Sequence, residues 1–388
     1  MKTEQKTWTP ASGWNPAGPA TLAQSAQLVL VFGAMSALRN SGLVQMIREF
    51  YPAAHIFGCS TAGEICGTLV SDDSLVTTAI HFEHTQLRAA QISLGADADG
   101  LRTGEYQARQ LQASIVDPDG GPEQKLAHVL VLADGLLING SELVRGLMER
   151  LPVNVAVTGG MAGDGARFGE TLVFNGDRPE QGIVSIVGLY GSRLKVGFGC
   201  AGGWSAFGPE RRVTRSKGNV LFELDGRPAL ALYKQYLGEH ARGLPGTGLL
   251  FPLNVWTAEG ETPVTRAVLG VDEEQQSMTF GGDVPEGAHA RLTKANSEKL
   301  VDGAIGAARA CLLPETIAPE LALLISCVGR KLVLKQRVEE EVEGVREILG
   351  EQAMLAGFYS YGEIAPFAPG GRCELHNETM TITTFAEV

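Results

Sequence analysis

Two short stretches decide the fold of this chain: GCSTAGEI at residues 58–65 and GFYSYGEI at residues 357–364. They share the pattern G-x-x-[ST]-x-G-E-I. Each follows an apolar run, QLVLVFGA at 27–34 or LALLISCV at 321–328, and then a segment with helical spacing. Those segments predict helices over 36–50 and 338–349. A β-rich run follows each motif, so the order β-α-β-β occurs twice.

A third copy of this unit is predicted between the two. AHVLVLAD at 127–134 supplies the apolar run, and a helix is expected over 141–151 with Ser141 as its N-cap. The glycine-rich stretch VAVTGGMAGDG follows at 155–165. In this alignment Ala162-Gly163-Asp164 stands 100 residues after Ala62-Gly63-Glu64. The middle copy shares few letters with the other two.

The three apolar runs contain no alternating polar residues, which indicates sheets that are buried on both faces and covered by helices. Between the second and third copies the chain is β-rich with frequent turns, and CAGGWSAFGP at 200–209 breaks the pattern. We therefore predict an α/β fold of repeated β-α-β-β units. They form two associated domains with mixed, largely buried sheets, and the domain boundary lies near residues 200–209.

Composition limits the classes of function. The 388 residues carry a net charge of −12, which argues against broad affinity for nucleic acid or anionic lipid. Neither a signal peptide nor an apolar stretch of the ~20 residues that span a bilayer is present, so we expect a cytoplasmic protein. The six cysteines are thinly spread without a CxxC pair, which is typical of buried thiols rather than disulfides or structural zinc. Small molecules or proteins are the expected partners.

The glycine-rich turns are the candidate binding site. Backbone N–H groups are accessible at such turns, and an acid accompanies each one. Hydroxyl and N–H groups would hold a carboxylate while the acids hold an ammonium, the combination that an amino-acid ligand needs. The alternative is that the glycines are turn residues and the acids cap local structure. The candidate ligand-binding residues are Ser60, Thr61, Glu64, Gly159, Gly160, Asp164, Ser360, Tyr361, Glu363 and Asn377.

Other chemistries have weaker signals. GGMAGDG lacks the Lys-Ser/Thr of a phosphate loop, and no GxSxG elbow marks a serine nucleophile. Cys59 and Cys66 are nucleophile candidates only in principle, so we do not expect an enzyme. No histidine pair has metalloprotease spacing. A noncovalent haem needs only one axial histidine, and His376 in CELHNETMTIT is the candidate, although a histidine bonded to backbone at a strand start is the commoner case.

At these residues the chain resembles the FIST family, described as F-box and intracellular signal transduction proteins. GCSTAGEI carries the resemblance to a FIST N domain, and GFYSYGEIAP followed by CELHNETMTITTF carries that to a FIST C domain. VTGGMAGDG followed by TLVFNG is also similar. The resemblance covers residues 27–387. It implies a FIST N-like sensory domain at 23–204 and a FIST C-like domain at 205–388. The residues before them, 1–22, are expected to form a loose N-terminal arm.

The resemblance also implies a function. The family suggests a sensor that binds a small ligand and passes the signal to a separate protein, and it supplies no catalytic residue. Stand-alone bacterial members include haem-binding nitric oxide sensors that act on a histidine kinase. Our first hypothesis is therefore a haem b-based nitric oxide sensor in a two-component system. The second is an iron-free sensor of an amino acid or related metabolite. A homo-oligomer is left open.

Overall fold

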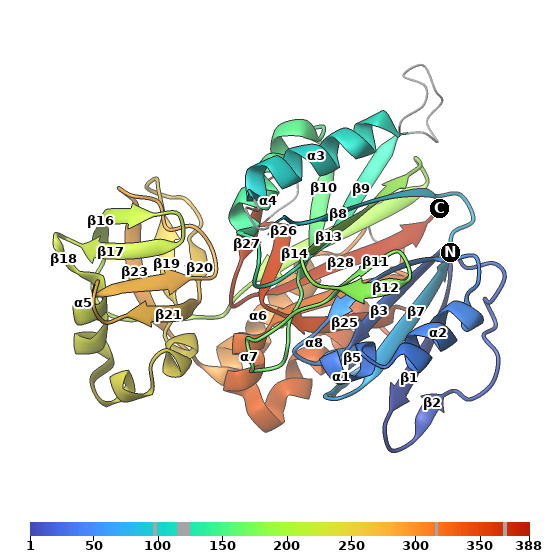
Figure 1. Cartoon of the computed structure of the whole chain (residues 1–388), viewed down its shortest axis with the longest axis horizontal. Helices are drawn as coiled ribbons and strands as arrows, with labels where there is room; N and C mark the ends of the chain where they lie inside the picture. The colour runs from blue at the N-terminus through green and yellow to red at the C-terminus, as the bar shows by residue number, and fades with distance from the viewer. Residues whose placement is uncertain (96–98, 115–124, 315–316, 368–370) are drawn as a thin grey trace.

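The computed structural model describes residues 1–95, 99–114, 125–314, 317–367 and 371–388. It divides into a large body and a side domain formed by residues 205–294 (Figure 1). The body holds three mixed sheets with helices packed on them, and the side domain holds one antiparallel sheet. The predicted α/β fold of repeated units in two domains is confirmed.

The body is made of three units with the same order of elements. Each has an edge strand, a first central strand, a helix, a second central strand parallel to the first, a short hairpin, and a last strand antiparallel to the first. Unit 1 comprises β1 (Lys2–Thr9), β3 (Leu28–Gly33), α1 (Met35–Leu38), α2 (Ser41–Phe50), β4 (His55–Ser60), β5 (Glu64–Cys66), β6 (Leu69–Ser71) and β7 (Leu75–His81).

The other two units add helices between the edge strand and the first central strand. Unit 2 comprises β8 (Gln86–Ser93), α3 (Gly100–Ala113), β9 (Leu126–Ala133), α4 (Gly140–Arg150), β10 (Ala156–Met161), β11 (Val173–Asn175), β12 (Arg178–Glu180) and β13 (Ile183–Tyr190). Unit 3 comprises β14 (Leu194–Ala201), α6 (Ser297–Ala310), β24 (Leu321–Cys327), α7 (Val328–Leu334), η4 (Lys335–Arg337), α8 (Val338–Leu349), β25 (Met354–Ser360), β26 (Gly362–Pro366), β27 (Cys373–His376) and β28 (Met380–Glu387).

The short hairpins tie the units together in a ring. The β5–β6 hairpin of unit 1 extends the sheet of unit 3 by pairing with β25, and the β26–β27 hairpin of unit 3 extends the sheet of unit 2 by pairing with β10. The β11–β12 hairpin of unit 2 pairs with β4 and so extends the sheet of unit 1. Each sheet therefore contains strands from two units, and residues 317–388 belong to the body.

The side domain interrupts unit 3 between β14 and α6. Its strands are β15 (Ser205–Ala206), β16 (Arg211–Lys217), β17 (Val220–Leu224), β18 (Arg227–Pro228), β19 (Leu253–Trp256), β20 (Val264–Arg266), β21 (Val268–Asp272), β22 (Ser277–Phe280) and β23 (His289–Lys294). Helix α5 (Ala229–Leu237) and the short turns η2 (Gly238–Gly243) and η3 (Gly246–Leu250) complete it. The residues predicted as one domain, 205–388, are thus divided in space between the side domain and the body.

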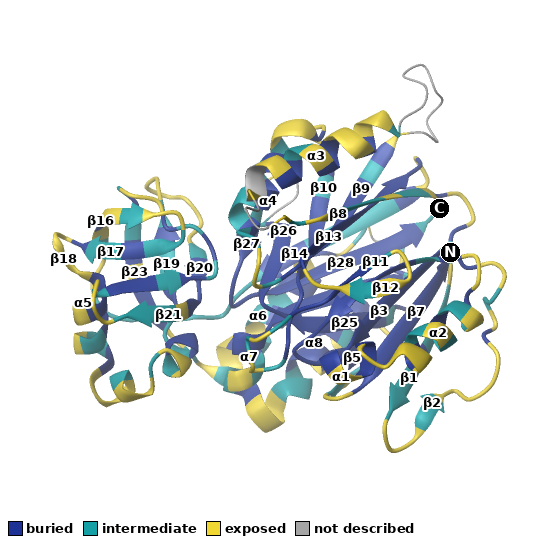
Figure 2. Cartoon of the chain, viewed as in Figure 1, coloured by how far each residue is buried: buried dark blue, intermediate teal, exposed yellow. Residues whose placement is uncertain are grey.

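The central strands β3, β9 and β24 are buried at every residue except Ala127, as their continuous apolar sequences predict (Figure 2). Helix α4 packs against α3, and α8 packs against α6. Among the described residues, no helix is long and apolar enough to cross a bilayer. All six cysteines are free thiols.

The prediction of a loose N-terminal arm is wrong. Residues 2–9 form β1, which pairs with β7 from Lys2 to Trp8, and β2 (Gly13–Asn15) folds back on it. The Lys6 side chain is buried, donates to the carbonyls of Pro16 and Gly18, and lies 5.0 Å from the centre of the Phe50 ring. β1 lies between β7 and the short strand β2 in the sheet, so its backbone groups are paired despite its polar sequence.

Candidate functional site

The three glycine-rich turns meet at the centre of the body, and backbone hydrogen bonds link them in a closed cycle. The N–H of Ala62 donates to Tyr359 O at 2.8 Å, and that of Gly163 donates to Ser60 O at 2.9 Å. The N–H of Tyr361 completes the cycle by donating to Met161 O at 3.2 Å. The convergence on which the predicted pocket depends is therefore present, but the N–H groups expected to face a ligand bind the neighbouring turn.

The acids of the first and third turns also have partners within the fold. Thr61 Oγ1 donates to Glu64, whose other oxygen accepts the N–H and Oγ of Ser74. Glu363 has the same arrangement: Ser360 Oγ lies 2.5 Å from Oε1, and the N–H of Thr379 donates to Oε2. Burial raises the pKa of Glu64 to about 7 and that of Glu363 to about 8. Each carboxyl thus ties its turn to the start of the last strand of its unit.

The second turn is one residue out of register with our sequence alignment. Gly58, Gly159 and Gly357 occupy equivalent positions, because a β-carbon at each would overlap the carbonyl oxygen of the paired strand. Counted from these glycines, Asp164 stands one residue before the position of Glu64, and the hairpin residue of unit 2 that pairs as Glu64 and Glu363 do is Val173. The predicted equivalence of Asp164 with Glu64 is therefore wrong. Asp164 instead accepts from the largely exposed Arg167. The sequence A-G-D resembles A-G-E, but the register of the paired strands, not the sequence similarity, decides which residues are equivalent.

The remaining residues of the predicted site are buried in this centre. Ser60 Oγ donates to Gly163 O and accepts from the N–H of Leu172. The Tyr361 ring stacks on Phe168, and its hydroxyl donates to Gly165 O. Gly160 lies against Ile325. These side chains bind one another, and the cavities described below have other linings.

His376 does not fit an axial haem ligand in this arrangement. The ring is fully buried, its Nε2 lies 2.8 Å from Ala365 O, and its edge meets the Phe367 ring. Burial lowers its pKa to about 4. Nδ1 has no hydrogen-bond partner among the described residues, but none of the three described cavities reaches this histidine. Asn377 is likewise buried, and its Oδ1 accepts from the N–H of Ala267 in the side domain.

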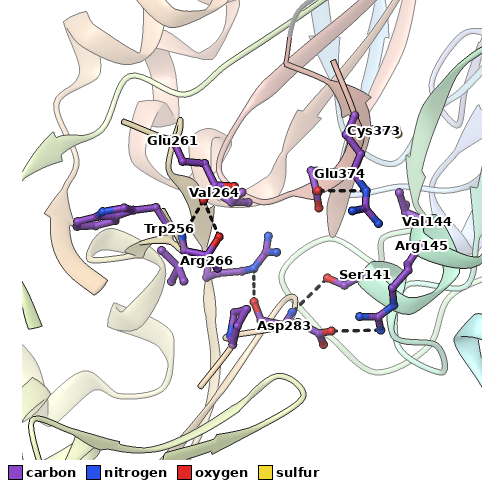
Figure 3. Close-up of a pocket in the computed structure, with 14 residues that line it drawn as sticks. Ser141, Val144, Arg145, Trp256, Glu261, Val264, Arg266, Asp283, Cys373 and Glu374 are labelled. Atoms are coloured by element: carbon purple, nitrogen blue, oxygen red, sulfur yellow. Dashed lines mark hydrogen bonds and ion pairs between the residues drawn. The ribbon is translucent and has the colours of Figure 1, made fainter. Parts of the chain in front are cut away.

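A cavity of about 320 Å³ lies at the seam between the side domain and the body (Figure 3). The body supplies the first two turns of α4 and the start of β27, and the side domain supplies β19, β20 and the turn after β22. The polar lining residues are Ser141, Arg145, Thr257, Glu261, Arg266, Asp283, Arg372 and Glu374. The apolar ones are Val144, Val255, Trp256, Val264, Pro285 and Cys373.

Arg266 is the unusual group in this cavity. Its residue is only 5% exposed, and it reaches from β20 toward the body with Asp283 on one side and Glu374 on the other (Figure 3). Nε donates to Asp283 O and Nη1 to Leu375 O, each at 2.8 Å. Within the described ranges, no carboxylate oxygen lies within 4.0 Å of the guanidinium. Burial lowers its pKa to about 10, and the charges of Glu374 and Asp283 partly oppose that shift. The pKa stays well above neutrality, so this buried group remains a cation.

The acids of the cavity differ in how far they are already satisfied. Glu261 accepts from Thr257 Oγ1 and from two backbone N–H groups, which lower its pKa. Asp283 accepts from Asn139 and lies 3.6 Å from Arg145. Burial raises the pKa of Glu374, and the charges of Arg266 and Arg372 oppose that shift; its one ion pair in the described chain is with Arg372 at 4.0 Å. Arg266 can therefore take an anionic group, and Glu374 can take a donor such as an ammonium.

Sequence reasoning missed this cavity because its lining comes from four distant stretches, each without a motif. The one local signal was the segment CELHNET, whose first residues, Cys373 and Glu374, line the cavity. We assigned Asn377 of that segment to the turns and His376 to a haem site. Arg266 has no pattern around it that marks it as buried.

Comparison with known proteins identifies two domains. The FIST N domain model matches residues 27–227, and the FIST C domain model matches residues 229–366. These matches do not support the expansion of the family name given above. An uncharacterized protein of Methanocaldococcus jannaschii is 23% identical over 317 residues, which is 76% of this chain and 59% of the relative. The chain thus spans about three fifths of the length of the curated relative it matches.

Solved structures give a weaker likeness. Cyanuric acid hydrolase from A. caulinodans aligns over 100% of this chain and 98% of its own, with a TM-score of 0.38 and 9% identity. A second cyanuric acid hydrolase structure has a TM-score of 0.35 and 7% identity. Similarity at this level carries no conclusion about function.

The two domain models together cover most of the chain, and both belong to the same family. FIST domains are sensor domains of signal transduction that bind small ligands. The chain therefore belongs to the FIST family, with a FIST N domain followed by a FIST C domain.

Proposed function

We propose that this protein is a sensor of a small zwitterionic metabolite, such as an amino acid, which binds in the seam cavity. The observation that carries the proposal is the buried Arg266 guanidinium, which has only backbone carbonyls as partners in the described chain. A buried cation is costly unless it is paired, and a ligand carboxylate would pair it. The ligand would be bound and released without turnover.

The cavity also supports a signalling role, because its walls belong to two domains. A ligand that contacts Arg266 from the side domain and Glu374 from the body bridges the seam. Binding would then favour the arrangement in which the two walls are close, and the population of that arrangement would carry the signal. The flat wall for the apolar part of the ligand is Trp256, which stacks on His289 with ring centres 5.6 Å apart.

A ligand screen by thermal shift tests this proposal. The probes are the common amino acids, the matching carboxylates without an amine, and the matching amines without a carboxylate. We expect at least one amino acid to raise the melting temperature, since a ligand at 100 times its Kd contributes about 2.7 kcal/mol. In Arg266→Gln the affinity for it should fall by about 30-fold or more, because a charge-assisted bond is lost.

Two controls separate binding from folding. Arg242→Gln removes an arginine of the same domain whose side chain is 81% exposed, and it should keep full affinity. Glu374→Gln should weaken the amino acid but leave the amine-free carboxylate unchanged. Arg266→Gln retaining full affinity for every hit would refute the proposal.

Haem-based nitric oxide sensing, with a histidine kinase as partner, is the finer prediction from the family resemblance. The free Nδ1 of His376 is the feature of this chain that favours it, whereas the full burial of that ring and the bond from Nε2 to Ala365 oppose it. The visible absorption spectrum of the protein with added haemin tests it. A sharp Soret band at one haem per chain, lost in His376→Ala, would replace our proposal with this one.

A further inference from the structure

The body contains a second groove that the repeated unit relates to the seam cavity. In unit 2 the groove lies between α4 and the β26–β27 hairpin, and in unit 1 it lies between α2 and the β11–β12 hairpin. Both helices begin after an asparagine, Asn139 or Asn40, whose side chain accepts N–H bonds from the first turn. Ser141 and Val144 line one groove, and Ser41 and Val44 line the other.

In unit 2 a turn from the side domain enters the groove. The N–H of Asp283 donates to Ser141 Oγ at 3.1 Å, and Asn139 Nδ2 donates to the Asp283 carboxylate at 2.7 Å. Arg145 lies 3.6 Å from the other carboxylate oxygen. An acidic turn thus docks onto the start of α4 through its backbone and its charge.

In unit 3 the groove is closed by the β5–β6 hairpin of unit 1, which extends the sheet of unit 3. Strand β6 packs on α8, and the N–H of Val70 donates to Glu339 at 3.3 Å. Of the three grooves, only that of unit 1 is covered neither by a turn of the side domain nor by a packed hairpin within the described chain. It is open over a cavity of about 800 Å³.

The open groove has a positive rim above an apolar floor. Leu38 and Leu172 form the buried part of its lining. Arg39 and Arg178 lie exposed at its edge, and Arg48 contributes a third cation. Arg39 contacts Glu170, and Arg48 contacts Asp177, which also lines the groove, whereas Arg178 has no ion pair in the described chain. The three arginines thus exceed the two acids by one positive charge. This excess of positive charge is local, because the whole chain carries −12.

We propose that the groove between α2 and the β11–β12 hairpin is the docking site for a partner protein that inserts an acidic turn. The turn would occupy the place that the Asp283 turn occupies in unit 2. Its backbone would bind at Ser41, and its carboxylate would face the arginines at the rim. The surface lies on a different unit from the seam cavity, so docking here does not depend on the ligand proposed above.

The chain itself provides a probe, the peptide FGGDVPE, which copies residues 280–286. We expect its addition in the millimolar range to shift the amide signals of α2 and β11–β12 in NMR spectra of the intact isotope-labelled protein. The peptide with asparagine at the Asp283 position should bind at least tenfold more weakly. The double variant Arg39→Glu with Arg178→Glu should lose affinity by about tenfold or more, and Arg242→Glu is the matched control.

Three results would overturn the proposal. One is the absence of shifts at α2 and β11–β12, and another is a peptide response that the double charge reversal leaves unchanged. The third is that inorganic phosphate at the same concentration reproduces the shifts and blocks the peptide, which would make the groove a small-anion site. Far-ultraviolet circular dichroism of each variant confirms that the exposed substitutions leave the fold intact.

Discussion

The centre of the body and the seam cavity contain the same kinds of residue but use them differently. At the centre, Glu64 and Glu363 accept bonds from neighbouring hydroxyls and N–H groups, and the turns bind one another. At the seam, Arg266 donates to two backbone carbonyls and has no ion pair within 4.0 Å in the described chain, although Glu374 and Asp283 lie near it. A repeated motif therefore marks the part that every unit needs for folding. A buried charge left unpaired marks the part that is free to bind.

The largest effect should come from the glycines that fix the strand register at the centre. Gly357→Ala places a β-carbon on the carbonyl oxygen of Leu324. Both clashing groups belong to the backbone of paired strands, so no side-chain movement can remove the overlap. We expect a loss of about 3 kcal/mol or more in the free energy of unfolding, measured by urea denaturation. The control is Gly306→Ala in α6, where nothing lies within 4 Å and the helix should gain slightly. Equal stabilities for the two variants would show that the centre is loosely packed.

The pH dependence of stability should be the next largest effect. The pKa of Glu363 is raised to about 8 in the fold by burial, whereas an unfolded glutamate titrates near 4.3. The folded state therefore binds more protons between these values, and the contribution of this group is lost as pH rises through 8. Glu363→Gln removes this titratable group. The free energy of unfolding of the variant, relative to that of the unmodified protein, should therefore increase from pH 5 to pH 9.

The size of that change is on the order of 3 kcal/mol, and denaturant titrations at the two pH values measure it. The same comparison for Glu64→Gln should give a smaller change at a lower pH, since its pKa is about 7. A pH-independent difference between Glu363→Gln and the unmodified protein would contradict the description of a closed, protonated carboxyl.

The smallest effect should come from the acid that sequence alignment wrongly equated with these two. Asp164 pairs with Arg167; the carboxylate side chain is only 6% exposed, but that of the arginine is 62% exposed, so solvent screens the pair and it contributes little. Asp164→Asn should change the free energy of unfolding by less than about 1 kcal/mol, measured by urea denaturation. A loss as large as that of Gly357→Ala would restore Asp164 to the role that the sequence suggested.

The sequence predicted the units because their apolar strands and helices are local patterns. The helix expected over 338–349 is α8, and the three apolar runs are β3, β9 and β24. It could not predict the hairpin exchange, since pairing between units depends on contacts between residues about 100 or more apart. The predicted register of the second turn was wrong for the same reason, because only the packing of Gly159 on Val131 fixes that register.

The seam cavity lay beyond sequence reasoning for a related reason. Arg266 precedes the strand β21 and resembles any charged residue at a strand end until the fold buries it against β27. The side domain brings that arginine to α4 across more than 100 residues of chain. No local sequence pattern indicates that these distant residues lie together, whereas the glycine-rich turns are recognisable from their glycines.

One measurement tests the central claim most directly: calorimetric titration of the best amino-acid hit into the unmodified protein, Arg266→Gln and Glu363→Gln. Each variant replaces one buried charged or titratable side chain, one at the seam and one at the centre. We predict that Arg266→Gln binds at least 30-fold more weakly and that Glu363→Gln binds as the unmodified protein does. Loss of binding in Glu363→Gln with full affinity in Arg266→Gln would place the ligand at the turns and contradict this account.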